Sequence, residues 1–247
     1  MDTVLREKFK ILLIGDNCTD VYQYGTIDRL SPEAPVPIFV PTHKEEREGM
    51  AGNVYKNLVT LGCNVTLVCG HPSIKTRFID SRSRQQVLRM DEDVKSIPVV
   101  NVDTTGYDAV VISDYDKGVV SYELIEKIIS SGALVFVDTK KTDLARLEGA
   151  WVKINELEYS KIKTTCDGLI VTRGAKGVDV ISHHIHSPAP NVEVVDVTGA
   201  GDTFLAALVV RFLENPNIKQ AVEFANKAAS ITVQHFGVYA PTLKEIQ

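Results

Sequence analysis

The chain has 247 residues and a net charge of -5, and the negative charge argues against general affinity for nucleic acid. A hydrophobic share of 44% and a charged share of 24% are those of a folded globular protein. No apolar run approaches the roughly 20 residues that cross a bilayer, no N-terminal segment resembles a signal peptide, and four cysteines show no disulfide spacing. We therefore expect a cytoplasmic protein that binds neither nucleic acid nor membrane.

The N-terminal part predicts a strand, a loop and an irregular connection, in that order. Lys10–Gly15 is apolar and predicts a buried strand. Residues 16–20 predict a polar loop at its carboxyl end, the edge where ligand sites of open α/β sheets gather. Three prolines within 30–37 forbid a helix and predict an irregular connection into an edge strand, Ile38–Val40.

The next segments alternate between helix and strand signals. Gly49–Leu61 predicts a turn and then a helix, with Gly62 as its stop. Asn64–Cys69 predicts a second strand, whereas Thr76–Met90 is arginine-rich and partly alternating, which suits an exposed sheet. Further strands are predicted at Ala109–Ile112, Leu134–Val137, Trp151–Ile154, Gly168–Thr172, Val178–Ile181 and His184–Ser187. Helices are predicted at Tyr122–Ser130 and at about 201–214 and 218–235.

Continuous apolar strands that alternate with helices predict one α/β domain over 1–247, with a mostly parallel central sheet covered on both faces. Residues of about 20–45 and 75–90 fit this alternation poorly. We predict that they form a small β-sheet lid over the site.

The string Asp196-Val-Thr-Gly-Ala-Gly-Asp-Thr-Phe204 places two glycines and a carboxylate at the start of an apolar helix. Backbone amides in such a turn can converge on an anion, and the helix N-terminus adds partial positive charge. Asp202 would then lie beside a bound phosphate, where it could take a proton from an attacking hydroxyl. The alternative is a structural turn, with an acid favoured by the helix dipole alone.

The nine-residue string resembles the signature of the ribokinase-like, or PfkB, carbohydrate kinases. This resemblance implies a three-layer α/β sandwich, ATP and Mg²⁺ as cofactors, and a monovalent cation as a further open requirement. It assigns Asp202 as the catalytic base and Gly199, Ala200 and Gly201 as the anion hole. It assigns to the nucleotide Asn155, Glu158, Thr172, Gly174, Gly177, Thr198 and Asn226, with Glu158 reaching the magnesium through water. Helix capping explains the Asn155 and Glu158 pair equally well, and an exposed helical position would explain Asn226.

The same resemblance assigns a set of side chains to the acceptor sugar, namely Asp16, Asp20, Gly49, Asn53 and Lys117. Each has a structural alternative: turn stabilisation for the two aspartates, a helix cap for Asn53 and plain solvation for Lys117. Met50 stands where the family has a second glycine, which puts hinge motion in doubt.

Further motifs resemble the subgroup of kinases that act on heptose 7-phosphate in lipopolysaccharide precursor synthesis. They are Arg29–Pro37, Ser113–Gly118, and the set Asp138, Lys140, Asp143 and Gly149. The resemblance implies a sugar phosphate acceptor, most closely heptose 7-phosphate at its anomeric hydroxyl. One departure concerns the acceptor: the stretch that the family carries between Gly70 and Thr76 is shortened. Bifunctional members of the family add a nucleotidyltransferase domain, which these 247 residues do not include.

Two clusters of basic side chains each have two alternative roles. Arginines 77, 82, 84 and 89 either keep a sheet edge soluble or grip a substrate phosphate. The histidines at 183, 184 and 186 alternate in a predicted hairpin, where solvent exposure is more usual than metal binding.

The alternatives for function are a kinase for another sugar or a nucleoside, a catalytically weak nucleotide or sugar phosphate binding protein, and an oligomerisation module. The exposed edges expected in a lid sheet suit a homodimer through the lid.

Overall fold

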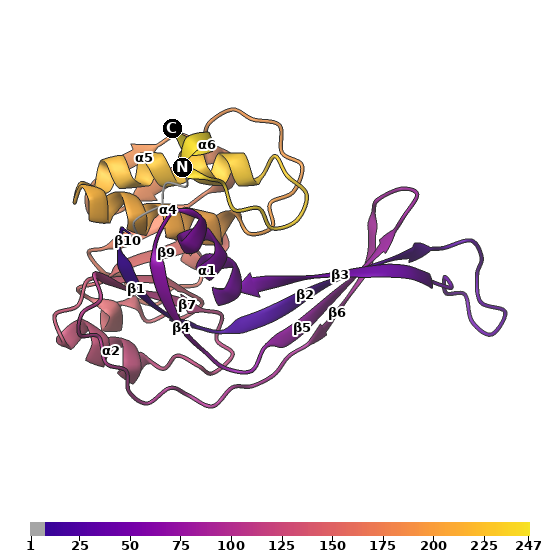
Figure 1. The fold of residues 1–247 in the computed structure, drawn as a ribbon, viewed down its shortest axis with the longest axis horizontal. Coiled ribbons are helices and arrows are strands. Elements are labelled where there is room, and N and C mark those ends of the chain that lie inside the picture. Colours follow the sequence, from indigo (N-terminus) through magenta and orange to yellow (C-terminus); the bar gives the residue numbers. More distant parts are fainter. Residues whose placement is uncertain (1–7) are drawn as a thin grey trace, which may run out of the picture.

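The computed structural model describes residues 8–247, which form a large sheet with helices on both faces and a smaller sheet that extends from one side (Figure 1). The large sheet has the strand order β12-β11-β10-β9-β8-β7-β1-β4, and the strands from β10 to β4 are parallel. Its strands are β1 (Lys10–Gly15), β4 (Asn64–Cys69), β7 (Ala109–Asp114), β8 (Val135–Thr139), β9 (Trp151–Asn155), β10 (Leu169–Thr172), β11 (Val178–Val180) and β12 (Ile185–Ser187). The predicted fold class and these strands are confirmed.

Helices cover both faces of the large sheet. Figure 1 shows α4 and α5 on one side of it and α2 on the other. The first face packs against α1 (Ala51–Thr60), α4 (Ala200–Glu214), α5 (Ile218–Thr232) and α6 (Leu243–Ile246). The second face packs against α2 (Tyr122–Ser130) and the short 3₁₀ helix Leu144–Leu147. Strands such as β1 and β7 are therefore buried on both sides, as their continuous apolar runs predict.

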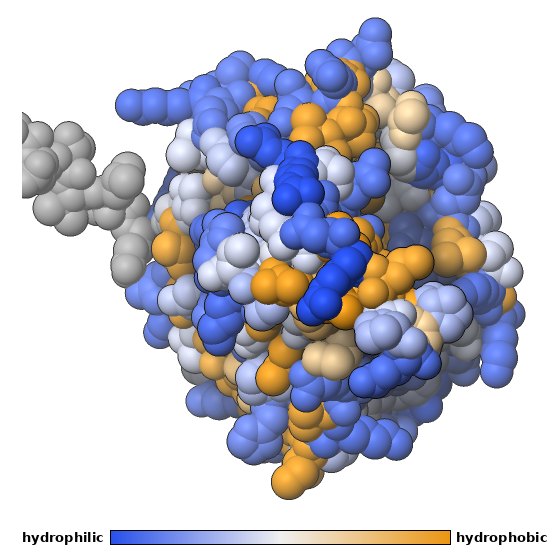
Figure 2. All heavy atoms as spheres, turned by 90° about the vertical axis from the view of Figure 1, so that its right-hand side faces the viewer, coloured by the Kyte–Doolittle hydropathy of each residue, from blue (hydrophilic) through white to orange (hydrophobic). Residues whose placement is uncertain are grey.

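The small sheet contains β2 (Asn17–Thr26), β3 (Val40–Met50), β5 (Ser73–Asp80) and β6 (Gln86–Glu92), in the order β3-β2-β5-β6. Figure 2 views the molecule from the side on which this sheet extends, and hydrophobic atoms are interspersed there with hydrophilic ones. Along β2, Cys18, Asp20 and Tyr22 are buried while the residues between them are half-buried. The face that carries Cys18, Asp20 and Tyr22 is called the inner face below.

Two predictions near the N-terminus are wrong. Residues 16–20 are not a polar loop, because β2 begins at Asn17 and pairs with both β3 and β5. The edge strand predicted at Ile38–Val40 instead begins at Val40 and runs to Met50. Both segments belong to a sheet that extends away from the core, and many of their side chains are polar. Their sequences therefore lack the apolar pattern that indicates a strand.

The small sheet joins the large one at two neighbouring points. Asp16 alone separates β1 from β2, and Met50 ends β3 directly before α1. The two points lie together, because Asn17 is paired with Met50 and the main-chain amide of Ala51 donates to the Asp16 carbonyl. Met50 has φ 52° and ψ -129°, a conformation in which a side chain is strained. No helix within residues 8–247 is long and apolar enough to span a bilayer.

Candidate active site

Asp202 lies in the first turn of α4, directly after the glycine turn. Gly199 has φ 80°, which favours glycine, and a Cβ there would approach the Asn53 amide nitrogen to 2.7 Å. The Asp202 side chain is buried, and both of its oxygens accept hydrogen bonds. Asn53 Nδ2 donates to Oδ2 at 2.8 Å, and the Tyr115 hydroxyl donates to Oδ1 at 3.1 Å. Predicted residues from α1 and α4 therefore meet at one carboxylate.

Burial raises the pKa of Asp202 to about 6, because it disfavours the charged form. The hydrogen bond from Asn53 opposes this shift, the nearby carboxylate of Asp138 adds to it, and Lys153 and Tyr115 oppose it. The carboxyl group stays largely ionised at neutral pH. Its pKa is close enough to neutral pH that the carboxylate accepts a proton readily. Such tuning is typical of a general base.

Lys153 is a buried cation next to the glycine turn. It stands on β9, is 4% exposed, and donates to Asp138 on the neighbouring β8 at 2.7 Å. A Cβ on Gly201 would come within 2.8 Å of the Lys153 ammonium, so glycine is needed there to leave room for the cation. The predicted anion hole thus has an ammonium group beside it.

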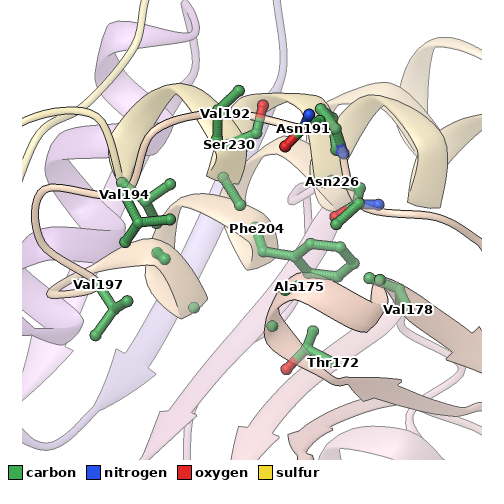
Figure 3. Close-up of a pocket in the computed structure, with 18 residues that line it drawn as sticks. Thr172, Ala175, Val178, Asn191, Val192, Val194, Val197, Phe204, Asn226 and Ser230 are labelled. Atoms are coloured by element: carbon green, nitrogen blue, oxygen red, sulfur yellow. The ribbon is translucent and has the colours of Figure 1, made fainter.

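A pocket of about 350 Å³ opens next to the same turn (Figure 3). Ala200 and Gly201 form part of its wall, and Figure 3 shows the Phe204 ring projecting between Asn226 and Ala175. Four of the residues assigned to the nucleotide also line it, namely Thr172, Gly174, Gly177 and Asn226. The wall is mostly apolar, with valines at 178, 192, 194, 197 and 233. Its size and lining suit a nucleobase.

The remaining residues assigned to the nucleotide make local hydrogen bonds. Asn155 caps the short helix α3 (Glu156–Tyr159), and Glu158 bonds back to the Asn155 amide, which is a capping box. The second oxygen of Glu158 pairs with Lys140. Both oxygens of Glu158 are thus engaged within the protein, and its predicted contact with Mg²⁺ through water stays a prediction. The Thr198 amide and hydroxyl both donate to Asp196.

On the acceptor side, Asp20 faces inward from β2 and is 4% exposed. Its Oδ1 pairs with Arg77 on β5, and a Cβ on Gly49 would come within 2.3 Å of its Oδ2. Glycine at 49 is thus required by the close approach of that carboxylate. Lys75, two residues before Arg77, lies with its ammonium 5.7 Å from the centre of the Tyr115 ring. Within residues 8–247 it makes no ion pair with a carboxylate.

Asp16 and Lys117 have other partners. The Asp16 carboxylate is 1% exposed and accepts the main-chain amides of Tyr115, Lys117 and Val119. It thereby holds the loop that follows β7. The Lys117 ammonium pairs with Asp93. Their predicted contacts with the sugar stay predictions.

The histidines at 183, 184 and 186 are all exposed, and His186 pairs with Asp179. Only Arg77 of the four arginines joins the Asp20 cluster, because Arg82 and Arg89 pair with Asp28 and Asp91 at exposed positions. Within residues 8–247 no group of three or more His, Cys, Asp and Glu side chains could hold a metal ion.

Sequence reasoning missed Lys153 and Tyr115. Lys153 interrupts an apolar strand, Trp151–Asn155, and a buried lysine needs a partner, which was a usable signal. Tyr115 stands within the Ser113–Gly118 motif, but nothing in the sequence indicates that its hydroxyl meets Asp202, 87 residues further along.

Comparison with known proteins gives consistent matches. The pfkB family carbohydrate kinase profile matches residues 124–245. The bifunctional protein HldE of a Nitratiruptor species is 33% identical over 301 aligned positions, which cover 97% of this chain and 64% of the relative. HldE of Shewanella sediminis is 32% identical, over 94% of this chain and 61% of the relative. The chain thus spans less than two thirds of the length of these relatives. The first alignment is also longer than the chain, so the relative carries segments that the chain lacks.

Solved structures match the fold at lower identity. Arabidopsis thaliana ribokinase, complexed with ribose and ATP, superposes with a TM-score of 0.72 at 18% identity, over 96% of this chain and 97% of its own. Phosphofructokinase-2 from Escherichia coli, in complex with potassium, gives a TM-score of 0.71 at 16% identity, over 97% of each chain. These likenesses confirm the ribokinase-like fold.

Proposed function

Since this chain belongs to the pfkB family of carbohydrate kinases, whose members are phosphotransferases with an alcohol acceptor, we propose that it phosphorylates a sugar phosphate with ATP. The acceptor is most closely heptose 7-phosphate, at its anomeric hydroxyl. One observation supports the proposal above the others: a buried carboxylate with a raised pKa adjoins a glycine turn that borders a nucleobase-sized pocket.

In the proposed reaction Asp202 accepts the proton of the acceptor hydroxyl as that oxygen attacks the γ-phosphorus. The bond from phosphorus to the β,γ-bridging oxygen breaks, and ADP leaves with that oxygen. The carboxylate's position at the start of α4 suits this task, because the same turn directs amides toward the transferring group.

Negative charge spreads over the transferring group, and the chain offers two kinds of stabilisation for it. The amides of Gly199, Ala200 and Gly201 act as donors, and the Lys153 ammonium lies beside Gly201. When bound, Mg²⁺ neutralises the triphosphate, and Glu158 would hold one of its waters. The apolar pocket takes the adenine next to Phe204 and Asn226.

The positive charges of Lys75 and Arg77 favour an acceptor that carries a negative charge. Both project from the inner face of the small sheet, and Lys75 is the cation there without an acidic partner among residues 8–247. A phosphate carried by the acceptor would supply that partner. Arg77, held by Asp20, keeps donors free at its other nitrogens. Asp20 and Asn53 would accept or donate to the sugar hydroxyls.

The test combines one isosteric variant with a panel of acceptors. Asp202→Asn should lower kcat by about 10²–10⁴-fold while leaving the affinity for ATP nearly unchanged. Near-normal turnover would contradict the role of Asp202. The panel compares heptose 7-phosphate with hexose phosphates, free sugars and nucleosides by ADP release. Preference for an uncharged acceptor would move the proposal to another kinase of the family, and no turnover with any acceptor would favour a binding protein.

A further inference from the structure

Each oxygen of the Asp202 carboxylate already accepts one hydrogen bond in the state described. Oδ2 is held by Asn53, which is itself fixed because the Asn57 amide donates to its carbonyl oxygens and Thr203 donates to Asn57. Oδ1 is held by the Tyr115 hydroxyl. An acceptor hydroxyl must reach one of these two oxygens before it can transfer its proton, and there it competes with the donor already present.

Tyr115 is the donor that can move. Among residues 8–247 its hydroxyl has Asp202 as its only hydrogen-bond partner, whereas Asn53 lies inside α1 and is fully buried. The Tyr115 backbone is anchored by the Asp16 carboxylate, and the residue is partly exposed although its hydroxyl is buried. Its ring lies near two ammonium groups, Lys75 of the small sheet at 5.7 Å and Lys140 at 5.1 Å. The ring thus lies between Lys75 of the small sheet and Lys140 after β8.

We propose that the Tyr115 hydroxyl holds, in the free protein, the place on Asp202 that the acceptor hydroxyl takes in the complex. The inference rests on the proposed function of Asp202 as the base. Tyr115 is then a positioning residue: it keeps the empty carboxylate ionised and oriented, and it gives up its place without exchanging a proton. Burial and the charge of Asp202 raise the pKa of Tyr115 well above its ordinary value, so the phenol stays protonated.

Tyr115→Phe separates this role from a structural one by its pH profiles. The profile of kcat/KM reports the free enzyme, and that of kcat reports the complex. A donor to an ionised carboxylate lowers its pKa, so removal of the hydroxyl should raise the Asp202 pKa in the free protein. We expect the acid limb of kcat/KM to move to higher pH by about one unit. The acid limb of kcat should stay in place, and KM for the acceptor should not rise.

The other charged or titratable groups near Asp202 are the same in the wild-type and Tyr115→Phe proteins. They are Asp138 on β8, Lys153 on β9, Lys140 after β8, and Lys75 and the Cys18 thiol on the inner face of the small sheet. The control is Tyr122→Phe, which also removes a phenol hydrogen bond, from the Asp143 amide, on the opposite face of the large sheet. It should move neither limb.

Two results would overturn the proposal. Equal shifts of both limbs would mean that Tyr115 stays on Asp202 throughout, and no shift of either would mean that it does not act on the base. A titration of the Asp202 carboxyl carbon by NMR, in the free wild-type and Tyr115→Phe proteins, needs no turnover. An unchanged pKa in that titration refutes the contact even if the kinase proposal holds. Full activity of Asp202→Asn would instead contradict the role of Asp202 as the base, while the titration would still show whether Tyr115 contacts it.

Discussion

The large and small sheets of this protein hold their charged groups in different ways. In the large sheet and the helix α4 that packs on it, Asp138, Lys153 and Asp202 are buried, and each has a fixed partner. In the small sheet β3 and β6 are exposed along most of their length, and Lys75 has no acidic partner among residues 8–247. Charges fixed in advance by partners can stabilise a transition state. A cation without an acidic partner can instead bind an anionic substrate reversibly. Changes in the large sheet should therefore alter turnover, and changes in the small sheet should alter acceptor binding.

Among changes within the two sheets, Lys153→Met should produce the largest effect. It removes a cation from beside the glycine turn, and we expect kcat to fall about 100-fold, as when one oxyanion donor is lost. The control is Lys141→Met, because Lys141 also forms a buried ion pair, with Asp114 at 3.1 Å. Both variants should lose about 3–5 kcal/mol of stability in thermal unfolding. Equal losses of kcat in the two folded variants would contradict a special role for Lys153.

Lys75→Met should act on the acceptor alone. We expect KM for a phosphorylated acceptor to rise about tenfold, equivalent to about 1.4 kcal/mol, with kcat nearly unchanged. Steady-state kinetics with the same sugar without its phosphate supply the internal reference, since its KM should not change. Lys44→Met is the matched control, because Lys44 pairs with Glu46 on the exposed strand β3. An identical rise for both sugars would refute an anion contact at Lys75.

Assembly offers a third test of the small sheet. We propose that its outer face pairs with that of a second copy. Strand register places Phe78 opposite Leu88 and Thr76 opposite Met90 on this face, and Leu88 and Met90 are 58% and 44% exposed. The wild-type protein should sediment as a dimer, and Leu88→Lys with Met90→Lys as a monomer. A monomeric wild type at micromolar concentration would exclude this interface.

The parts of the fold that were predictable are those where apolar pattern and burial coincide. The runs in β1 and β7 and the glycine turn before α4 are visible in the sequence because each is a local signal. The start of β2, up to Asp20, was predicted as a loop because the buried charge of Asp20 hides the alternation there. A carboxylate can be buried there only because Arg77 comes from another strand.

The same reason explains the site residues that were missed. Lys153 meets Asp138 because the register of two parallel strands places them side by side. Tyr115 meets Asp202 because the loop after β7 and the start of α4 end at one edge of the sheet. Pairings of this kind depend on tertiary structure, and no local spacing encodes them. The roles predicted for the other site residues stay predictions.

The smallest expected effect concerns Met50, at the point where the small sheet joins the large one. Its φ of 52° is strained for a side chain, so Met50→Gly should be more stable than Met50→Ala by about 1–2 kcal/mol in urea unfolding. The alanine variant is the control, since it loses the same buried side chain but keeps the strain. Glycine is ordinarily the less stable of the two. A less stable glycine variant would show that the junction carries no strain.

Asp16 links the junction of the two sheets directly to the loop that carries Tyr115. Its main chain connects β1 to β2 and accepts the Ala51 amide, while its carboxylate holds the amides of the loop that carries Tyr115. We therefore expect a rotation of the small sheet about this residue to move that loop, through the Asp16 side chain alone. Acceptor binding at the small sheet and movement of Tyr115 away from Asp202 would then be directly coupled through Asp16.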